Sequence, residues 1–370
     1  MAAPHVKALV LACALALTAS AAFAQLRIGQ TVGVTGAVAA TVKESMQGAQ
    51  LYLDHVNAKG GVGGEKIEIV TLDDAFDVKK AEANARSLIE ERGVLALFMS
   101  RGTPHTEAIN TVLEQHRVAL IGPSTGAMVL HQPVKPYIFN VRATYQREAE
   151  RAMAHLASIG VRKVAVVHVD DSFGADGLQG ARNGLKTAGL EPVAVAKFDR
   201  TKPDFAPLLP ALQSAEPQAV LIIGSGTAVV EGIRSLKAAR VGGQYLTLSN
   251  NASGGFIKLL GDQAQGVIVS QVMPASLNFG LVKEATQLAK AKGVDEVSPA
   301  MLEGFAAAKV LVEGLRRAGA KPSRASLHQA LDNLGRLDLG GLVLDYSPSD
   351  HTGLDFADLS IVGTGGRFRR

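Results

Sequence analysis

Two neighbouring loops rich in hydroxyl and glycine residues are the part of this sequence best suited to bind a small ligand. Each loop follows a short apolar run and leads into a helix: residues 100–103 follow the run 96–99, and residues 122–126 follow the run 118–121. Loops at the carboxyl ends of adjacent parallel strands meet at a crevice where ligands bind. Hydroxyl groups and free N–H groups at helix N-termini suit a small anion such as a carboxylate. We therefore expect these two loops to form half of a binding site.

The second loop also matches a motif for nucleophilic catalysis. Gly122-Pro123-Ser124-Thr125-Gly126 fits the G-x-S-x-G pattern of serine hydrolases, and two aspartates and then His351 follow in the order that a triad requires. The oxyanion loop of such enzymes is missing, because the glycine run 60–64 follows a helix and precedes a strand. Pro123 also lacks the N–H that helps to fix a tight elbow. A serine hydrolase that uses Ser124 therefore stays a minor alternative.

Other patterns that carry chemistry in proteins are weaker. The histidines between positions 105 and 155 show no ligand spacing, so we expect no metal site. Gly174, Gly177 and Gly180 are three apart, which is not the dinucleotide fingerprint. Asp170 and Asp171 follow a predicted strand, where an acid either caps the next helix or contacts a ligand. Both interpretations of the aspartates stay open.

The composition is that of a globular α/β protein large enough for two lobes. The chain has 370 residues, 47% of them hydrophobic and 19% charged, and single cores stop growing at roughly 250–300 residues. The formal net charge is +4, but the 38 basic and 34 acidic residues are interspersed. Neither a basic stripe nor interleaved aromatic residues appear, so we expect no nucleic-acid partner.

The first 24 residues resemble a secretory signal peptide. An apolar run, 8–17, is followed by the small-x-small end Ala22-Phe23-Ala24. Cys13, the single cysteine, lies inside the apolar run, too early for a lipidation site, so the mature chain from Gln25 would contain no thiol. No later apolar run approaches the roughly 18 residues of a membrane span. We expect a soluble, exported protein.

Strand and helix patterns alternate twice along the chain, which predicts two similar lobes. In the first set we expect strands at 26–29, 66–71, 96–99 and 118–121. We expect helices at 37–57 and, after Asp73-Asp74, up to about residue 91. An extended segment at 137–144 would then end the first lobe and lead into the second, and we call such a segment a crossing. In the second set we expect strands at 163–169, 192–198, 219–223 and 245–248, helices at 146–158, 205–214 and 228–239, and loops at 170–174, 224–227 and 249–255, with a helix between 174 and 188. Residues 267–273 and 341–346 would form the second and third crossings, on either side of helices 279–292 and 299–318.

A series of motifs, taken in order, resembles the leucine/isoleucine/valine-binding family. These are periplasmic solute-binding proteins of ABC importers. The resemblance covers residues 26–370 and rests on Ala58-Lys59-Gly60-Gly61-Val62-Gly63-Gly64, Asp73-Asp74, Gly102-Thr103-Pro104, Gly122-Pro123-Ser124-Thr125-Gly126-Ala127, Phe139-Asn140-Val141-Arg142, Asp171-Ser172-Phe173-Gly174, Leu302-Glu303-Gly304-Phe305 and Asp350-His351.

The resemblance implies a fold and its domain boundaries. The fold would be α/β, with two Rossmann-like lobes joined by three hinge strands, as in type I periplasmic binding proteins. Residues 25–142 plus 275–346 would form the first lobe, and residues 143–274 plus 347–370 the second. The protein would be a monomer without enzymatic activity or cofactor, and its partner would be an inner-membrane ABC permease.

The resemblance also implies which residues meet the ligand. From the first lobe, the ligand carboxylate would contact Ser100, Gly102, Thr103, Ser124 and Thr125. Phe173 of the second lobe stands where relatives often place a tyrosine that covers the ligand. Asp171, Ser225, Ser249, Asn250 and Asn251 would complete that side.

Two departures from the family pattern bear on the ligand. Amino-acid binders of the family often place an acid where this chain has Ser249-Asn250-Asn251, and that acid pairs with the ligand ammonium. Burying an ammonium without a carboxylate is costly, so either Asp171 takes that role or the ligand has no ammonium. Arg101 replaces a small or apolar residue and either pairs with a carboxylate or faces solvent at the rim.

The sequence therefore predicts a periplasmic receptor for a small carboxylate. The expected ligand is a branched-chain or other apolar amino acid, and the alternative is an aromatic or aliphatic acid without an amine. A receptor that partners a signalling protein in place of a permease is a further alternative, which the sequence of this chain does not distinguish.

Overall fold

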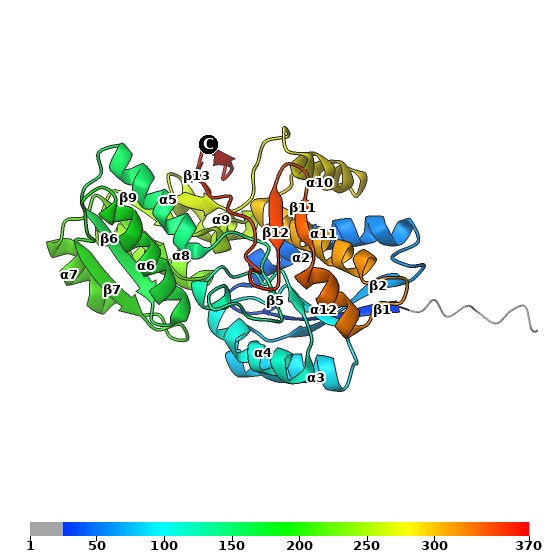
Figure 1. Ribbon diagram of the computed structural model, residues 1–370. Helices are drawn as coiled ribbons and strands as arrows, with labels where there is room; N and C mark the ends of the chain where they lie inside the picture. The colour runs from blue at the N-terminus through cyan, green and yellow to red at the C-terminus, as the bar shows by residue number, and fades with distance from the viewer. Residues whose placement is uncertain (1–24, 370) are drawn as a thin grey trace, which may run out of the picture.

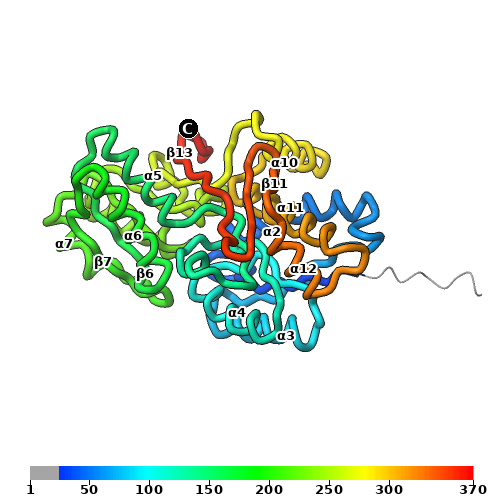
Figure 2. Tube along the Cα trace, in the orientation of Figure 1, coloured from blue at the N-terminus to red at the C-terminus, as the bar shows by residue number. Residues whose placement is uncertain are grey.

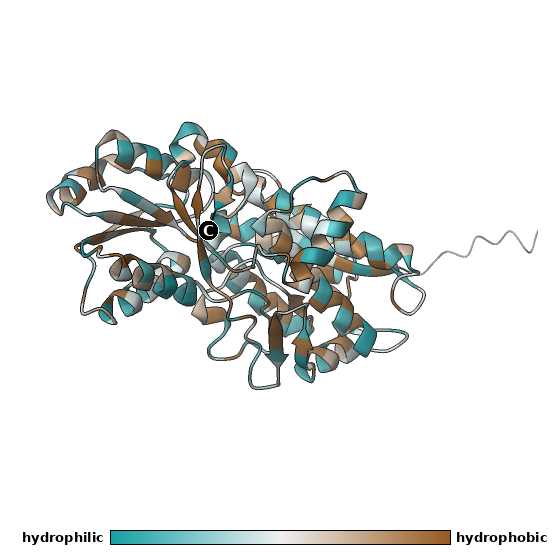
Figure 3. Ribbon diagram, turned by 90° about the horizontal axis from the view of Figure 1, so that it is seen from above, coloured by the Kyte–Doolittle hydropathy of each residue, from teal (hydrophilic) through white to brown (hydrophobic). Residues whose placement is uncertain are grey.

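The computed structural model of the protein describes residues 25–369 and shows two α/β lobes side by side (Figure 1). The expected signal peptide lies outside the described residues and stays a prediction. Each lobe has its own main sheet and its own large apolar cluster. In the hydropathy colouring of Figure 3, the strands of the sheets are largely brown and the outer helices carry much of the teal. The predicted two-lobed α/β fold is confirmed.

The first lobe is built on a parallel five-stranded sheet in the order β2-β1-β3-β4-β5, with helices on both faces. Leu97 and Leu120 face the apolar cluster under two helices, while Phe98 and Ile121 face the cluster on the opposite side. The strands are β1 (Gln25–Val32), β2 (Lys66–Asp73), β3 (Ala96–Phe98), β4 (Leu120–Ile121) and β5 (Ile138–Phe139). The helices are α2 (Ala39–Ala58), α3 (Val78–Glu90), α4 (Thr103–His116), η1 (Met128–Leu130), α10 (Gly280–Ala291), α11 (Pro299–Arg317) and α12 (Arg324–Asp332).

The second lobe is built on a seven-stranded sheet in the order β14-β13-β10-β9-β8-β6-β7. Its central strands are apolar runs buried along their whole length, as parallel strands covered on both faces require. The strands are β6 (Val164–Val169), β7 (Ala194–Phe198), β8 (Ala219–Ile223), β9 (Gln244–Thr247), β10 (Ile268–Gln271), β13 (Asp358–Val362) and β14 (Phe368–Arg369). The helices are α5 (Tyr145–Ser158), α6 (Ser172–Lys186), η2 (Ala206–Leu208), α7 (Leu209–Ser214), α8 (Thr227–Ala238), η3 (Ser249–Asn251), α9 (Gly254–Leu260) and η4 (Gly261–Ala264).

The third crossing lies later in the chain than the sequence analysis expects. The expected crossing at 341–346 is instead the second strand, β12 (Val343–Tyr346), of a hairpin with β11 (Gly335–Asp338). Its alternating pattern does form a strand, but its partner is a short charged segment that the pattern does not reveal. Leu344 and Tyr346 pack in the main cluster of the first lobe.

The chain returns to the second lobe after this hairpin (Figure 2). There it runs beside the first crossing: the N–H of Asn140 donates to the carbonyl of His351 at 3.1 Å, and the N–H of Leu354 donates to that of Val141 at 2.9 Å. The segment then enters β13, which pairs antiparallel with β10. Two of the crossings therefore support each other through backbone hydrogen bonds.

Two expected loops contain helix. The loop at 170–174 ends early, because α6 already begins at Ser172. The loop at 249–255 holds η3 and the start of α9, although α9 begins with two glycines. The hydroxyl of Ser253 accepts the N–H of Phe256 at 3.0 Å and so caps the helix. Helix α9 is also packed against η4 and α8, which propensity alone does not show.

Helices α2 and α11 pack at very short range through two glycines. A Cβ atom added at Gly48 would lie 1.9 Å from the carbonyl oxygen of Met301. One added at Gly304 would lie 1.9 Å from the carbonyl oxygen of Ser45. Each helix therefore presents a glycine to the backbone of the other, and the position of α11 over the first sheet depends on both.

Replacing Gly48 by alanine should force the two helices apart. We expect Gly48→Ala to lower the free energy of unfolding by about 1–3 kcal/mol, as overpacked cores do. The control is Lys43→Ala, on the exposed face of the same helix, which should change it by less than about 0.5 kcal/mol. Urea unfolding of both variants measures the difference, and equal midpoints would contradict the glycine contact.

Candidate ligand-binding site

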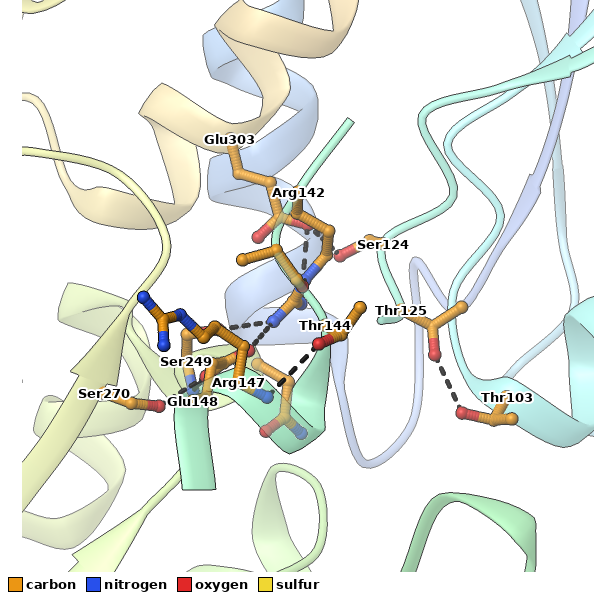
Figure 4. A network of polar contacts seen from close by, with 12 residues as sticks. Thr103, Ser124, Thr125, Arg142, Thr144, Arg147, Glu148, Ser249, Ser270 and Glu303 are labelled. Carbon is orange, nitrogen blue, oxygen red and sulfur yellow. Dashed lines mark hydrogen bonds and ion pairs between the residues drawn. The ribbon is translucent and has the colours of Figure 1, made fainter. Parts of the chain in front are cut away.

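The two predicted loops of the first lobe do come together. The N–H of Ser124 donates to the carbonyl of Ser100 at 2.7 Å, which joins the end of β4 to the end of β3. The hydroxyls of Thr103 and Thr125 lie 2.8 Å apart (Figure 4). All four side chains are buried. The carboxyl ends of two parallel strands thus place four hydroxyl groups in one region, as the sequence analysis expects.

Gly102 is needed for the turn between β3 and α4. Its φ is +93°, and a Cβ atom there would lie 2.6 Å from Nδ1 of His105 and 3.0 Å from Cε2 of Phe76. Only glycine adopts this conformation readily. No side chain caps the start of α4, and Pro104 has no N–H, so the N–H groups of Thr103 and His105 have no partner within the helix.

Arg101 lies in the interior, between the lobes. Only 3% of its surface is exposed. Its Nη1 donates to the hydroxyl of Ser124 at 3.2 Å, and its Nη2 reaches the second lobe, where it donates to the carbonyl of Asn250 at 2.5 Å. Burial lowers the pKa of Arg101. The alternative of a solvent-facing arginine at the rim is therefore wrong.

The loops after β8 and β9 meet on the second-lobe side. Nδ2 of Asn250 donates to the carbonyl of Gly224 at 2.9 Å and to the hydroxyl of Ser225 at 3.1 Å. Asn251 donates to the same carbonyl at 3.1 Å, and its Oδ1 accepts the N–H of Gly226 at 2.9 Å. Oδ1 of Asn250 is buried and has no hydrogen-bond partner. These two hydrogen-bonded loops contact Arg101 through the carbonyl of Asn250.

Asp171 is both a helix cap and an ion-pair partner. Its Oδ1 accepts the N–H groups of Phe173 and Gly174 at the start of α6, at 3.0 and 3.2 Å. Its Oδ2 lies 2.5 Å from Nη2 of Arg200 and 2.6 Å from Nε. Phe173 itself is buried against the ring of Tyr145, with 4.5 Å between the ring centroids. The helix-cap interpretation of Asp171 is confirmed.

A buried ion-pair network crosses between the lobes beside these loops (Figure 4). Nη2 of Arg142 contacts the carboxylate of Glu148 and donates to the hydroxyl of Ser249 at 2.6 Å. Nη1 of Arg142 lies 3.7 Å from Glu303, on α11 of the first lobe. Glu303 in turn accepts the hydroxyl proton of Ser124 at 2.7 Å. The network therefore connects a predicted loop of each lobe.

The sequence analysis did not assign a role to the three charged residues of this network. Arg142 and Glu303 stand inside two of the motifs that carry the family resemblance, but Glu148 does not. Nothing in their spacing indicates that they meet, because 155 residues separate Glu148 from Glu303. The tertiary fold alone brings them together.

The serine hydrolase alternative does not fit the geometry. The hydroxyl of Ser124 contacts Glu303 and Arg101, not a histidine. His351 stacks on the ring of Phe139, 4.2 Å between centroids, and its Nε2 lies 2.9 Å from Asp332. The serine and histidine of the supposed triad are therefore bound to different partners, and no nucleophile is activated at Ser124.

A cavity of 140 Å³ opens between the lobes near these loops. Ala37 and Phe76 of the first lobe line it, together with Arg200 and Ser225 of the second. The guanidinium of Arg200 lies over the ring of Phe76, 5.1 Å from its centroid. Larger cavities of 280 and 530 Å³ elsewhere include none of the predicted site residues. Among residues 25–369, no cluster of metal-ligating side chains is present, and no helix is long and apolar enough to cross a membrane.

The fold and the converging loops are those of a type I periplasmic binding protein, and comparisons agree. The family model for periplasmic binding proteins matches residues 25–356. The chain is 27% identical over 336 residues to Leu/Ile/Val-binding protein homolog 3 of Brucella melitensis, with 89% of each chain covered. It is 24% identical over 316 residues to the Leu/Ile/Val-binding protein of Escherichia coli, with 84% of this chain and 85% of that one covered. A substrate-binding periplasmic protein from Ralstonia solanacearum has the same fold, with a TM-score of 0.84 at 30% identity, and 93% of this chain and 99% of that one are covered.

The chain therefore belongs to the periplasmic binding protein family. The resemblance to the leucine/isoleucine/valine-binding type is confirmed. Members of this family are substrate-binding proteins and not enzymes, and they work in the periplasm.

Removing one partner of the buried network should strongly destabilise the protein. We expect Glu148→Gln to cost about 3–5 kcal/mol, because it leaves the buried guanidinium of Arg142 without its nearest carboxylate. Glu150→Gln, two residues later on the same helix, removes a carboxylate that is only half-buried and should cost less than about 1 kcal/mol. Urea unfolding compares the two variants. If both cost the same, the network is not important for stability.

Asp176 should make stability depend on pH. Burial raises its pKa to about 6, above the ordinary 3.8, although Oδ1 accepts from Gln146 at 2.8 Å and from the N–H of Met128 at 3.1 Å. Because the folded pKa is the higher one, the stability that it contributes is complete below about pH 3.8 and is lost as the pH rises through about 6.

We therefore expect the wild type to lose about 2–3 kcal/mol relative to Asp176→Asn between pH 4 and 7. Groups common to both proteins cancel in this difference, which urea unfolding at several pH values measures. Asp295→Asn, at an exposed position, is the control. A difference that does not change with pH would show that Asp176 titrates normally.

Proposed function

We propose that the protein is the receptor of an ABC importer that binds a small carboxylate ligand between its lobes and delivers it to an inner-membrane permease. The chain would reach the periplasm by means of the signal peptide expected at residues 1–24 and act as a monomer. The lobe boundaries of the sequence analysis are part of this proposal. The two separate apolar clusters support a division into two lobes.

The observation that carries the proposal is the direct contact between loops of the two lobes. Arg101 reaches the carbonyl of Asn250, and the N–H of Thr227 donates to the carbonyl of Ala37 at 3.1 Å. The hydroxyl of Ser172 donates to Glu107 at 2.5 Å. A ligand that touches both sets of loops would stabilise this closed arrangement relative to an open one.

The ligand would use groups from both lobes. Its carboxylate would lie near the hydroxyls of Thr103 and Thr125 and the start of α4, which agrees with the anion preference of helix N-termini. The proposed contacts are Ser100, Arg101, Gly102, Thr103, Ser124 and Thr125 from the first lobe and Asp171, Phe173, Ser225, Ser249 and Asn250 from the second.

Two classes of ligand have support. The curated relatives are named for leucine, isoleucine and valine, which favours a branched-chain or other apolar amino acid. The ion pair between Asp171 and Arg200 favours the second class, aromatic or aliphatic acids without an amine, because that aspartate is already occupied. A receptor that partners a signalling protein in place of a permease would bind the same ligands and would differ only in its protein partner.

A thermal-shift panel on refolded, ligand-stripped protein tests the proposal. A ligand at one hundred times its dissociation constant should add about 2.7 kcal/mol to the stability. We expect at least one apolar carboxylate, with or without an amine, to raise the melting temperature, and the same compound as its neutral amide to be inactive. A panel without any response would contradict a carboxylate receptor.

Thr125→Ala should weaken binding of the responding carboxylate by about tenfold or more, because a hydrogen bond to a charged group contributes about 1.5–3 kcal/mol. Thr364→Ala, at an exposed position far along the second lobe, should bind like the wild type. The melting temperature of each free variant separates a loss of affinity from a loss of folding. Unchanged affinity in Thr125→Ala would place the carboxylate elsewhere.

A further inference from the structure

Arg101 differs from the other arginines close to the predicted loops. Arg142 contacts Glu148, and Arg200 pairs with Asp171. Arg101 is buried as deeply as Arg142 but has no carboxylate within ion-pair distance among the described residues. Its partners are a hydroxyl and a backbone carbonyl. A buried cation without a directly bonded carboxylate is costly, and Glu303 reaches Arg101 only through the hydroxyl of Ser124. An anion from outside the chain would therefore be favourable beside Arg101.

The guanidinium of Arg101 also has unused donors. It carries five N–H groups in a planar fork, which suits a carboxylate bound through two parallel hydrogen bonds. Two of its hydrogen bonds are to protein oxygens, those of Ser124 and Asn250. The bond to Asn250 crosses between the lobes, so a ligand held by Arg101 is also held against the second lobe.

The hydroxyl of Ser124 is not free to take the place of Arg101. It donates its proton to Glu303 at 2.7 Å and accepts an N–H of Arg101 at 3.2 Å. A hydroxyl has one proton, so Ser124 has none left for a ligand carboxylate. Of the proposed contacts in these loops, Arg101 therefore offers the strongest free donors.

Three acids that contact these loops, Asp171, Glu148 and Glu303, are already occupied, so none of the three is free to pair with an ammonium. Asp171 accepts two N–H groups of α6 and the fork of Arg200. Glu148 is bonded to Arg142 and accepts the N–H of Ser249 at 2.9 Å. Glu303 accepts from Ser124 and lies beside Arg142. To bind an ammonium, one of these carboxylates would have to give up a buried arginine or a helix start.

Asn250 stands in the loop where amino-acid binders of the family often place an acid. Its Nδ2 is used by Gly224 and Ser225, and its buried Oδ1 has no partner. An amide oxygen accepts a hydrogen bond but carries no charge to neutralise a cation. A hydroxyl, in contrast, would satisfy it without introducing charge.

An added carboxylate has electrostatic support beyond Arg101. Three helices that start near the lobe interface, α2, α4 and α8, have no side-chain cap. Each start carries about half a positive charge. The same field that favours a carboxylate disfavours an ammonium.

We propose, on the basis of the proposed function, that the ligand is an apolar carboxylic acid without an amine, and that Arg101 is the residue that recognises its carboxylate. The unpartnered Oδ1 of Asn250 would accept a hydroxyl on the neighbouring carbon where the ligand has one.

Three compounds that differ at one carbon test the ligand class. They are leucine, the hydroxy acid in which a hydroxyl replaces its ammonium, and the plain acid in which hydrogen does, together with the corresponding set built on phenylalanine. Isothermal titration of the refolded full chain should show that the hydroxy acid and the plain acid bind at least tenfold more tightly than the amino acid in one of the sets. An amino acid that binds as tightly as both of its counterparts, or more tightly, would overturn the inference.

Variants of Arg101 test its role with the compound that binds. Arg101→Met should weaken binding by about 100-fold, as the loss of one partner of a buried charge pair does. Arg101→Lys keeps the charge without the fork and should be intermediate. Arg182→Met, on the exposed face of α6, is the control and should bind like the wild type. Melting temperatures of the variants without ligand show whether they fold. If Arg101→Met does not fold, the affinity of Arg101→Lys decides whether Arg101 binds the carboxylate.

The outcomes separate the inference from the proposed function. Tight binding of an amino acid that survives the loss of Arg101 would overturn the inference and leave a carboxylate receptor in place. Failure of all acids, amino acids included, to bind the wild type would overturn both.

Discussion

The buried guanidinium of Arg142 is the constraint on which the arrangement of the two lobes depends. An arginine keeps its charge in a protein, so the burial of Arg142 is costly unless carboxylates pair with it. One of them, Glu148, belongs to the second lobe, and the other, Glu303, to the first. Because Arg142 itself lies in the first crossing, the hinge, helix α5 and helix α11 have to keep one geometry. The contacts of Ser249 and Ser124 with this network extend the constraint to the binding loops.

This pairing of charges also shapes the binding site. Asp171, Glu148 and Glu303 are held by Arg200, Arg142 or a helix start, and Arg101 is left with neutral oxygens. Selectivity of such a site follows from the charge that the protein leaves unmatched. In a closed, desolvated site the difference in affinity between a matched and an unmatched ligand charge is large, because an unpaired ion is far more costly there than in water. The neutral Asn250 and the buried Arg101 thus both favour a ligand that has a carboxylate and no ammonium.

Patterns that depend on neighbours in the chain were predicted well. The strand at 219–223 is β8, residue for residue, because a continuous apolar run between turns has one interpretation in an α/β fold. The loops after β3 and β4 meet as expected, because parallel strands place their carboxyl ends at one edge. The hairpin β11–β12 and helix α9 were not predicted. The hairpin depends on the pairing of β12 with a short charged strand. Helix α9 depends on a serine cap and on packing, which outweigh the low helix propensity of the two glycines at its start.

The sequence by itself determined the class of protein, the two-lobed α/β fold and the loops that carry the hydroxyl groups, since periodicity, turn residues and the order of motifs are local properties. Only the tertiary structure decided what the charged residues do. In the tertiary structure Arg101 is buried between the lobes and does not lie at the rim. Asp171 forms an ion pair with Arg200, and Arg142 pairs with glutamates from both lobes. The energy of a charge depends on its burial and on its neighbours in space. Neither can be read from spacing along the chain.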